Sequence, residues 1–331
     1  KQLNVSISTV SRAMRNAPDV NNETKKAVMA LAEELNYQPN RLALSLRQKQ
    51  THTIGVSVPN LDCVLSMMVR GIDEVALEAG YTVMVCQSNE SFGREIVNTR
   101  RLLESLVDGF IISVSSETKS FEHFKKIQER GIPMIVFDRT TPHLTAPTVH
   151  LDNEEGGFMA TEHLLEQGYK RIAILAGPKN LGISNSRMDG YMNALKKYKI
   201  KPDPTLMIHC DFNQDYAYFA TEELLAMKKK PDAIFAISDR MGIGASLAIK
   251  KKGLSMPDDI ALVSFNNEPI VSLVTPGISS VEMPSFEMGK AAAKLFIETM
   301  HHPEDMSGVE RIFKPKLFIR ESSQKSLVKK L

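Results

Sequence analysis

A run of small hydroxyl residues followed by an arginine stands near the start of the chain, over residues 5–12 (Val-Ser-Ile-Ser-Thr-Val-Ser-Arg). Ser6 is a suitable N-cap for a helix of about two turns, on which Ile7, Ser8 and Arg12 project away from an apolar stripe. Short side chains let a helix enter the major groove of DNA, where arginine can bond guanine and isoleucine can contact a thymine methyl group. An ordinary amphipathic helix in a small bundle is the alternative interpretation.

A second group of polar residues follows the predicted strands in the rest of the chain. Doubly wound sheets bind ligands beyond the carboxyl ends of their parallel strands. Charged and amide side chains there can clamp a hydroxyl-rich or heterocyclic ligand, and an aromatic ring can stack on its apolar face. Turn and cap residues also occur at such positions, and an acid before a helix is often only a cap. The candidates are Asn60, Asp138, Arg139, Arg187, Phe212, Ser238, Asp239 and Asn266.

Other chemistries find no support in the sequence. It contains no nucleophile elbow, phosphate-binding loop or paired-histidine zinc motif, so we expect no enzyme, no cofactor and no metal site. Cys63, Cys86 and Cys210 are far apart, which indicates free thiols in a reducing compartment. No apolar run reaches the ~18 residues of a membrane span and no signal peptide opens the chain, so we expect a cytoplasmic protein without membrane contact.

Charge is unevenly distributed along the chain. Residues 1–50 hold eight Lys/Arg against four Asp/Glu, whereas the remainder holds 33 against 35. A basic head on a nearly neutral body favours a polyanionic partner for the head alone, with chance clustering of surface lysines as the alternative. The length of 331 residues favours two or three domains.

The elements that position the first group form a small helical head. Asn21 is suited to cap a second helix. The apolar face of that helix consists of Ala27, Val28, Leu31, Ala32 and Leu35. Pro39 then ends the helical pattern. The leucine-rich segment 41–47 that follows is too short to be a stable helix alone. Its leucines, bracketed by Arg41 and Arg47, suit an apolar wedge in a DNA minor groove with phosphate-binding flanks.

The rest of the chain alternates short apolar runs with amphipathic helices, which indicates an α/β fold with helices on both faces of parallel sheets. Predicted strands cover 53–58, 81–86, 109–114, 133–137 and 148–151, and then 171–175, 206–209, 233–237 and 260–265. Predicted helices include 64–79, 94–106, 154–166, 187–198 and 215–227. The two series predict two doubly wound parallel-sheet lobes with a ligand site in the crevice between them.

The head resembles that of a known family. Residues 5–12, 24–28 (Thr-Lys-Lys-Ala-Val) and 35–40 (Leu-Asn-Tyr-Gln-Pro-Asn) are similar to the DNA-binding head of lactose-repressor/galactose-repressor (LacI/GalR) transcription factors. The resemblance implies that Ile7, Ser8 and Arg12 read bases and that Leu46 is the wedge. The predicted DNA-binding residues are Ser6, Ile7, Ser8, Thr9, Ser11, Arg12, Asn40, Arg41, Ala43 and Leu46. The family's first helix would precede Lys1, so we expect a chain truncated within its helix-turn-helix.

Motifs of the body extend the resemblance over nearly the whole chain. They lie at 134–139, 152–157, 187–191, 238–242, 263–267 and 279–284. The resemblance implies lobes like those of periplasmic binding proteins, with Asp138, Arg187, Phe212, Ser238 and Asn266 at effector-contacting positions. The family usually has an acidic residue where this chain has Asn266. Loss of that acceptor favours a phosphorylated or otherwise anionic effector as an alternative to a simple sugar.

We therefore expect a partial helix-turn-helix domain over 1–38, a hinge helix over 39–51, an effector-binding body over 52–322 and a tail over 323–331. Within the body, the first lobe is expected over about 52–151 and 282–306 and the second over about 152–281 and 307–322.

This organisation predicts a ligand-responsive repressor that binds a pseudo-palindromic operator as a homodimer. Its DNA affinity is expected to change when a small metabolite (a sugar, sugar phosphate or purine-like molecule) binds between the lobes. A protein co-effector is a further candidate partner. The alternative is a periplasmic-type sugar-binding protein without DNA function, which the basic head disfavours.

Overall fold

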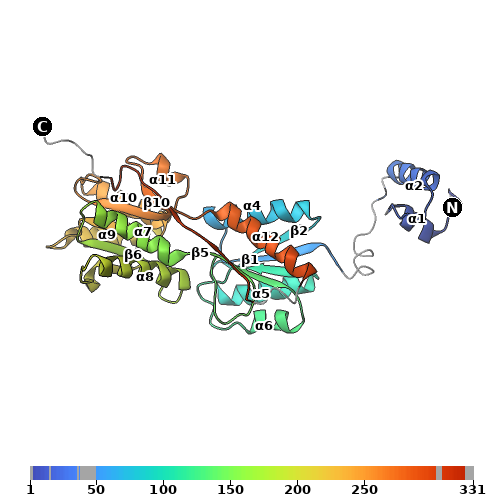
Figure 1. Ribbon diagram of the computed structural model, residues 1–331, viewed down its shortest axis with the longest axis horizontal. Helices are drawn as coiled ribbons and strands as arrows, with labels where there is room; N and C mark the ends of the chain where they lie inside the picture. The colour runs from blue at the N-terminus through green and yellow to red at the C-terminus, as the bar shows by residue number, and fades with distance from the viewer. Residues whose placement is uncertain (1–2, 15, 36, 38–49, 303–307, 325–331) are drawn as a thin grey trace. The chain divides into compact units, whose positions relative to one another are not determined.

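A computed structural model describes residues 3–14, 16–35, 37, 50–302 and 308–324 (Figure 1). The chain divides into two compact units, Lys1–Thr51 and His52–Leu331. In the ranges described, no helix is both long enough and apolar enough to cross a membrane.

The first unit is helical. Its described helices are α1 (Ile7–Met14) and α2 (Asn22–Glu34). Ser6 precedes α1, and its Oγ accepts a hydrogen bond from the backbone nitrogen of Thr9 at 3.1 Å, as an N-cap does. Asn21 caps α2, because its Oδ1 accepts a hydrogen bond from the backbone nitrogen of Thr24 at 2.7 Å. The buried centre of the unit is formed by Ala13, Val20 and Val28. The predicted wedge segment, 41–47, lies outside the described residues.

The first lobe of the second unit is built on a six-stranded sheet of order β11-β5-β4-β3-β1-β2, in which all paired strands are parallel. Its strands are β1 (Thr53–Val58), β2 (Thr82–Gln87), β3 (Gly109–Ile112), β4 (Met134–Phe137), β5 (Thr148–Leu151) and β11 (Glu310–Phe313). Its helices are α4 (Cys63–Glu78), α5 (Phe92–Glu104), α6 (Glu122–Glu129) and α12 (Ser285–His301).

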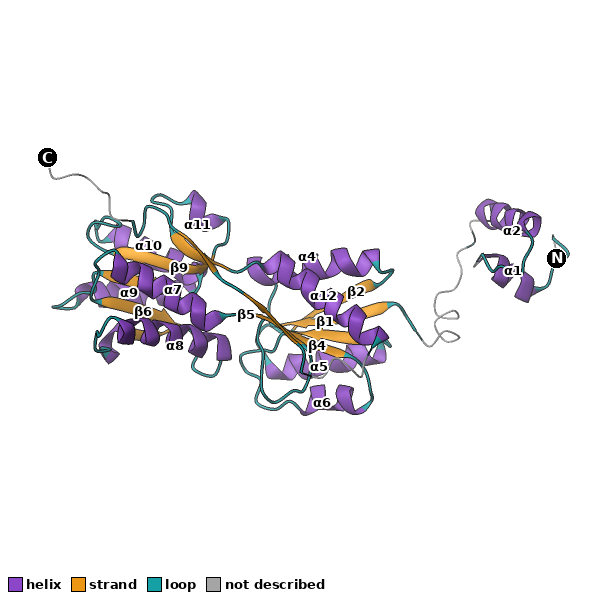
Figure 2. Ribbon diagram, in the orientation of Figure 1, coloured by secondary structure: helices purple, strands orange, loops and turns teal. Residues whose placement is uncertain are grey.

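Side chains of this sheet alternate between two buried faces. In β3, Phe110 and Ile112 pack in the core beneath α5 and α6, whereas Ile111 joins the core beneath α4 and α12. Figure 2 shows these two helix pairs on opposite sides of the sheet. Burial on both faces explains why the central strands appear in the sequence as unbroken apolar runs.

The second lobe has a six-stranded sheet of order β12-β10-β9-β8-β6-β7. Its strands are β6 (Ile172–Ala176), β7 (Met207–His209), β8 (Ala233–Ala236), β9 (Ala261–Asn266), β10 (Ser279–Glu282) and β12 (Lys316–Phe318), with β12 antiparallel to β10. Its helices are α7 (Asn153–Glu166), α8 (Gly182–Lys197), the 3-10 turn η1 (Pro204–Leu206), α9 (Gln214–Ala226), α10 (Asp239–Lys251) and α11 (Ile270–Leu273). The helix α7 packs against α8, and α9 against α10.

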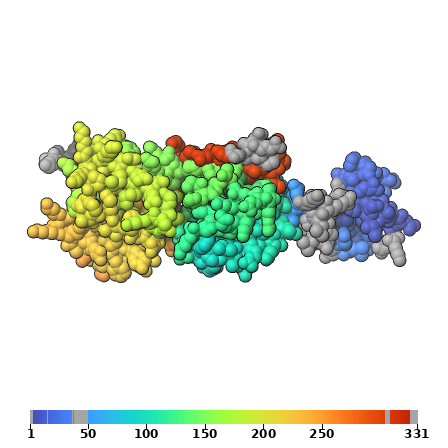
Figure 3. Space-filling model, turned by 90° about the horizontal axis from the view of Figure 1, so that it is seen from below, coloured from blue at the N-terminus to red at the C-terminus, as the bar shows by residue number. Residues whose placement is uncertain are grey.

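The chain passes between the lobes three times, from β5 to α7, from β10 to α12 and from β11 to β12. The first and last crossings are tied together, because Lys314 Nζ donates to Asp152 Oδ2 at 2.8 Å. Figure 3 shows the two lobes in contact, with part of the red C-terminal segment over the cyan-to-green first lobe.

The predicted α/β architecture of two doubly wound lobes is confirmed. The last lobe boundary differs from the prediction at 306–307, since β11 still belongs to the first sheet and the crossing lies between Phe313 and Lys316. The physical reason is that β11 pairs with β5 at the sheet edge, where half-exposed side chains give no hydrophobic signal.

Candidate functional site

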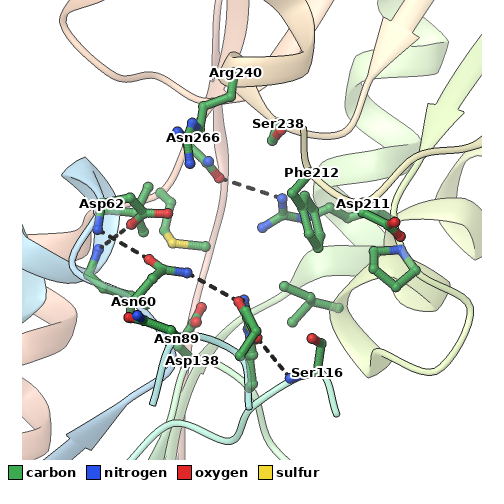
Figure 4. Close-up of a pocket in the computed structure, with 18 of the residues that line it drawn as sticks. Asn60, Asp62, Asn89, Ser116, Asp138, Asp211, Phe212, Ser238, Arg240 and Asn266 are labelled. Atoms are coloured by element: carbon green, nitrogen blue, oxygen red, sulfur yellow. Dashed lines mark hydrogen bonds and ion pairs between the residues drawn. The ribbon is translucent and has the colours of Figure 1, made fainter. Parts of the chain in front are cut away.

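A cavity of about 600 Å³ lies between the two lobes of the second unit (Figure 4). Its walls come from loops that follow the carboxyl ends of strands in both sheets. Asn60 follows β1 and Asp138 follows β4 in the first lobe, while Ser238 follows β8 in the second. Seven of the eight predicted effector-binding residues line the cavity, namely Asn60, Asp138, Arg139, Arg187, Phe212, Ser238 and Asn266.

Arg187 is held in place on several sides by the second lobe. Its Nε donates to Asn153 Oδ1 at 2.8 Å, and its Nη1 donates to the carbonyl oxygen of Ile237 at 2.6 Å. The guanidinium carbon lies 3.6 Å from the centroid of the Phe265 ring, at cation–π distance. Burial lowers the pKa of Arg187 to about 9, so the side chain remains charged at neutral pH. The result is a fixed cation in the cavity wall.

Arg139 is paired with Glu90 inside the first lobe. Its Nη1 and Nη2 donate to the two carboxylate oxygens of Glu90 at 2.7 and 2.9 Å. Burial alone would raise the pKa of Glu90, but the hydrogen bonds and charge of Arg139, together with Ser116, lower it below its ordinary value. Asn60 Nδ2 also donates to Glu90, at 3.2 Å. Glu90 thus ties together three segments of the cavity wall.

Asp138 is a buried carboxylate that faces the cavity, with 6% of its surface exposed. Burial raises its pKa. Its backbone is left-handed, with φ of 60°, and the same holds for the lining residues Phe212 (51°) and Asn266 (113°). Such backbone is strained for residues other than glycine and is concentrated at binding sites.

Asp239 does not line the cavity, so the prediction of a ligand contact there is corrected. Its side chain is fully buried and accepts hydrogen bonds from Ser264 Oγ, from Ser280 Oγ at 2.7 Å and from the backbone nitrogen of Glu268 at 2.6 Å. Burial raises the pKa of Asp239 to about 7, against these hydrogen bonds. Asp239 therefore positions the loop that carries Asn266 and Glu268 into the cavity.

The sequence did not point to several residues of the cavity wall. Asp62, Glu90, Ser116, Asn180, Asp211, Arg240 and Glu268 are among them. Most of them lie two to four residues after the end of a strand. A search that extended this far beyond each predicted strand would have included them. Asn180 Nδ2 donates to the carbonyl oxygen of Ser116, and this bond joins the two lobes across the cavity.

The first unit presents the predicted DNA-contacting face of α1. Ile7 is 91% exposed, and Ser6, Ser8 and Arg12 are exposed as well, while Thr9 and Ser11 are half-buried. Arg12 Nη1 donates to Asp19 Oδ2 at 2.7 Å in an ion pair that solvent reaches. The remaining predicted DNA contacts, Asn40, Arg41, Ala43 and Leu46, lie outside the described residues.

Comparison with known proteins links the two units. The family model of bacterial regulatory proteins, lacI family, matches residues 1–40, and that of the periplasmic binding protein-like domain matches 161–323. A ribose operon repressor of Halalkalibacterium halodurans is 32% identical over 98% of this chain and 95% of its own. The chain belongs to the lacI family of bacterial regulatory proteins.

Two solved structures of regulators resemble this lacI-family chain as a whole. The transcriptional regulator CelR in complex with cellobiose is 28% identical, with a TM-score of 0.74 over 97% of both chains. The lac repressor dimer bound to operator and an anti-inducer has the same fold, with a TM-score of 0.87 at 24% identity over 97% of this chain and 96% of its own.

The family resemblance of the head and body motifs is therefore confirmed, and this lacI-family protein is a DNA-binding transcriptional regulator of the repressor type. The match over 1–40 does not favour the alternative of a periplasmic sugar-binding protein without DNA function. The roles of individual residues remain predictions.

Proposed function

We propose that this regulator senses a hydroxyl-rich sugar or sugar derivative in the cavity between its lobes, and that binding changes its affinity for operator DNA. The supporting observation is that Asp138 of the first lobe and Arg187 of the second line one cavity with the Phe212 ring. Its volume of about 600 Å³ is within the usual range for small-molecule sites. Named relatives in complex with cellobiose, or assigned to a ribose operon, agree with this ligand class.

The side chains have complementary roles in this proposal. Arg187 donates hydrogen bonds to ring hydroxyls and Asp138 accepts them, which orients the ligand between the lobes. The Phe212 ring stacks on the apolar face of the sugar. Asn60, Ser238 and Asn266 supply further polar contacts, whereas Arg139 acts through its pairing with Glu90. The ligand is bound and not chemically changed, so the protein acts as a regulator and not as an enzyme.

For DNA, we propose that two copies pair and each presents α1 to one half-site of a pseudo-palindromic operator in the cytoplasm. Ile7, Ser8 and Arg12 then reach base edges, while Ser6, Thr9 and Ser11 lie near phosphates. Asn40, Arg41, Ala43 and Leu46 are proposed to contact the centre of the operator. The lac repressor structure, a dimer on its operator, supports this arrangement.

The test of the sensor function is thermal unfolding of the full chain with a panel of sugars that includes ribose and cellobiose. A ligand at about 100 times its dissociation constant should stabilise the protein by about 2.7 kcal/mol. Arg187→Ala and the milder Phe212→Ala should each abolish this shift, while Arg100→Ala, on the exposed side of α5, should keep it. If no sugar of the panel stabilises the protein, or if the stabilisation survives in both cavity variants, the proposal is contradicted.

A further inference from the structure

The cavity wall carries more negative than positive charge. It is lined by six carboxylate side chains and three guanidinium groups. The carboxylates belong to Asp62, Glu90, Glu117, Asp138, Asp211 and Glu268, and the guanidinium groups to Arg139, Arg187 and Arg240. Arg139 pairs with Glu90, which leaves five carboxylates and two guanidinium groups. Arg187 keeps its charge, because its hydrogen-bond partners Asn153 and the carbonyl of Ile237 are neutral. Arg240 is exposed, and its charge acts on Glu268 less than that of Asp62 does.

Two of the acidic residues approach the cavity from opposite lobes. Asp62 caps α4 in the first lobe, where its Oδ1 accepts a hydrogen bond from the backbone nitrogen of Leu65 at 3.2 Å. Glu268 lies in the second lobe, on the loop that Asp239 holds. Burial, and then the negative charge of Asp62, raise the pKa of Glu268. The two carboxylates therefore repel each other across the cavity.

Asp138 adds an independent sign that a ligand supplies hydrogen-bond donors here. It is 6% exposed, and it accepts one long hydrogen bond, from Ser113 Oγ to Oδ2 at 3.5 Å. In the described part of the chain, no group donates to its Oδ1, and neither Asp62, Asp138 nor Glu268 forms an ion pair. A carboxylate oxygen in a cavity wall that has no donor within the protein can accept a hydrogen bond from a ligand.

We propose that the effector carries a protonated amino group on its hydroxyl-rich ring, and that this group binds between Asp62 of the first lobe and Glu268 of the second. The inference rests on the proposed sensor function and adds the charge class of its ligand. A cation between the two carboxylates replaces their repulsion by attraction to both, so it draws the lobes together. The same carboxylates would repel the phosphate group of a sugar phosphate. The proposal therefore reverses the expectation, drawn from Asn266 alone, of a phosphorylated or otherwise anionic effector.

The test compares ligands that differ in charge but share one ring. Isothermal titration of the full chain uses glucose with glucosamine and glucose 6-phosphate, and the corresponding neutral, amino and phosphorylated forms of galactose and ribose, at a pH that keeps the amine protonated. For the ring that fits, the amino form should bind at least tenfold more tightly than the neutral form, and the phosphorylated form should bind most weakly.

The preference for the amino form is then measured in variants. Asp62→Asn and Glu268→Gln should each reduce the ratio of the two dissociation constants to threefold or less, while Glu129→Gln, an exposed carboxylate on α6, should leave it unchanged. A neutral or phosphorylated sugar that binds as tightly as the amino form, or a preference that survives both cavity variants, overturns the inference and leaves the sensor function intact. Absence of binding by every compound overturns both.

Discussion

At the scale of single residues, Arg187 shows how a buried charge can be kept without a carboxylate in hydrogen-bond contact, although the charges of Asp138 and Asp239 also favour it. Its side chain is 2% exposed, yet its nitrogens bond an amide and a carbonyl oxygen and its plane lies on the Phe265 ring. These contacts use the planar shape of the guanidinium, which the ammonium group of lysine lacks. The protein therefore fixes this cation before any ligand arrives, and the ligand need not order it.

The buried carboxylate of Asp239 leads to a prediction about pH. Burial raises its pKa to about 7 from the ordinary value of 3.8. A carboxyl group with a raised pKa stabilises the fold fully below its unfolded pKa, and this contribution is lost as pH rises through the folded pKa. Between about pH 4 and 7, the wild-type protein should therefore lose stability relative to Asp239→Asn, by at most about 1.4 kcal/mol per pH unit.

Urea unfolding of both proteins at a series of pH values measures this difference. The titrations of all other groups cancel between the two proteins, and the hydrogen bonds lost in the variant add a constant offset. A difference in unfolding free energy that does not vary with pH would show that Asp239 is ionised throughout.

Residue types alone predicted seven residues of the cavity wall but not the electrostatics of the cavity. The strand-end rule located Asp138, Arg187 and Ser238 because it depends only on where parallel strands stop. The rule could not show that the side chain of Asp239, one residue after Ser238, points into the protein interior. That direction depends on hydrogen bonds from Ser264 and Ser280, which are distant in the sequence. Glu90 could not be predicted for the same reason, because its partner Arg139 lies far from it in the sequence.

At the scale of elements, the pair α7 and α8 depends on two glycines that face each other's backbone. A Cβ atom on Gly157 of α7 would overlap the carbonyl oxygen of Arg187, and a Cβ atom on Gly190 of α8 would overlap that of Glu154. The helices can approach this closely only because both positions lack a side chain. The close approach in turn lets Arg187 Nε on α8 donate to Oδ1 of Asn153, the first residue of α7, at 2.8 Å.

Gly190→Ala should therefore weaken both the fold and the site. Overpacking of this kind typically costs ~1–3 kcal/mol of stability. Because Arg187 is on the same helix, a shift of α8 should also raise the dissociation constant for the effector. Urea unfolding and ligand titration measure the two effects.

Gly93→Ala on α5 is the matched control, since an added Cβ there meets only one atom, at 3.9 Å. It should leave ligand affinity unchanged and the fold as stable or slightly more stable, because alanine favours helix. Equal behaviour of the two variants would rule out the packing role of Gly190.

Elements were predictable where burial is apolar and not where it is polar. The runs that became β1, β4, β8 and β9 were evident in the sequence, with bounds shifted by a residue or so. The strand β10 was not predicted, because it begins with Ser279 and Ser280, which are fully buried hydroxyl residues. Their burial is compensated by Ser323 and Asp239, contacts that no local pattern reveals.

At the scale of the whole molecule, the proposed repressor combines a basic head with an acid-lined cavity. The two charges suit different partners, a polyanion for residues 1–50 and a neutral or cationic small molecule for the body. The two partners therefore do not compete for one site, and any effect of one on the other must pass through the protein.

Coupling between the two partners must be reciprocal if the proposed regulation holds. If saturating effector changes the operator dissociation constant by some factor, saturating operator must change the effector dissociation constant by the same factor, typically ~5–150-fold. Titrations of effector with and without operator DNA measure it. Arg12→Ala should weaken operator binding and leave effector affinity without DNA unchanged. An effector dissociation constant that is the same with and without operator DNA in the wild-type protein would contradict the proposed regulation.

The three crossings between the lobes also constrain how such a chain can change by recombination. Each lobe is assembled from separate stretches of sequence, so no single pair of breakpoints in the gene can exchange one lobe for that of a relative. Lys1–Thr51 is one continuous stretch, and a single junction is enough to replace it. New pairings of operator and effector are therefore expected to arise most simply by exchange of the head, which leaves both lobes and the cavity between them intact.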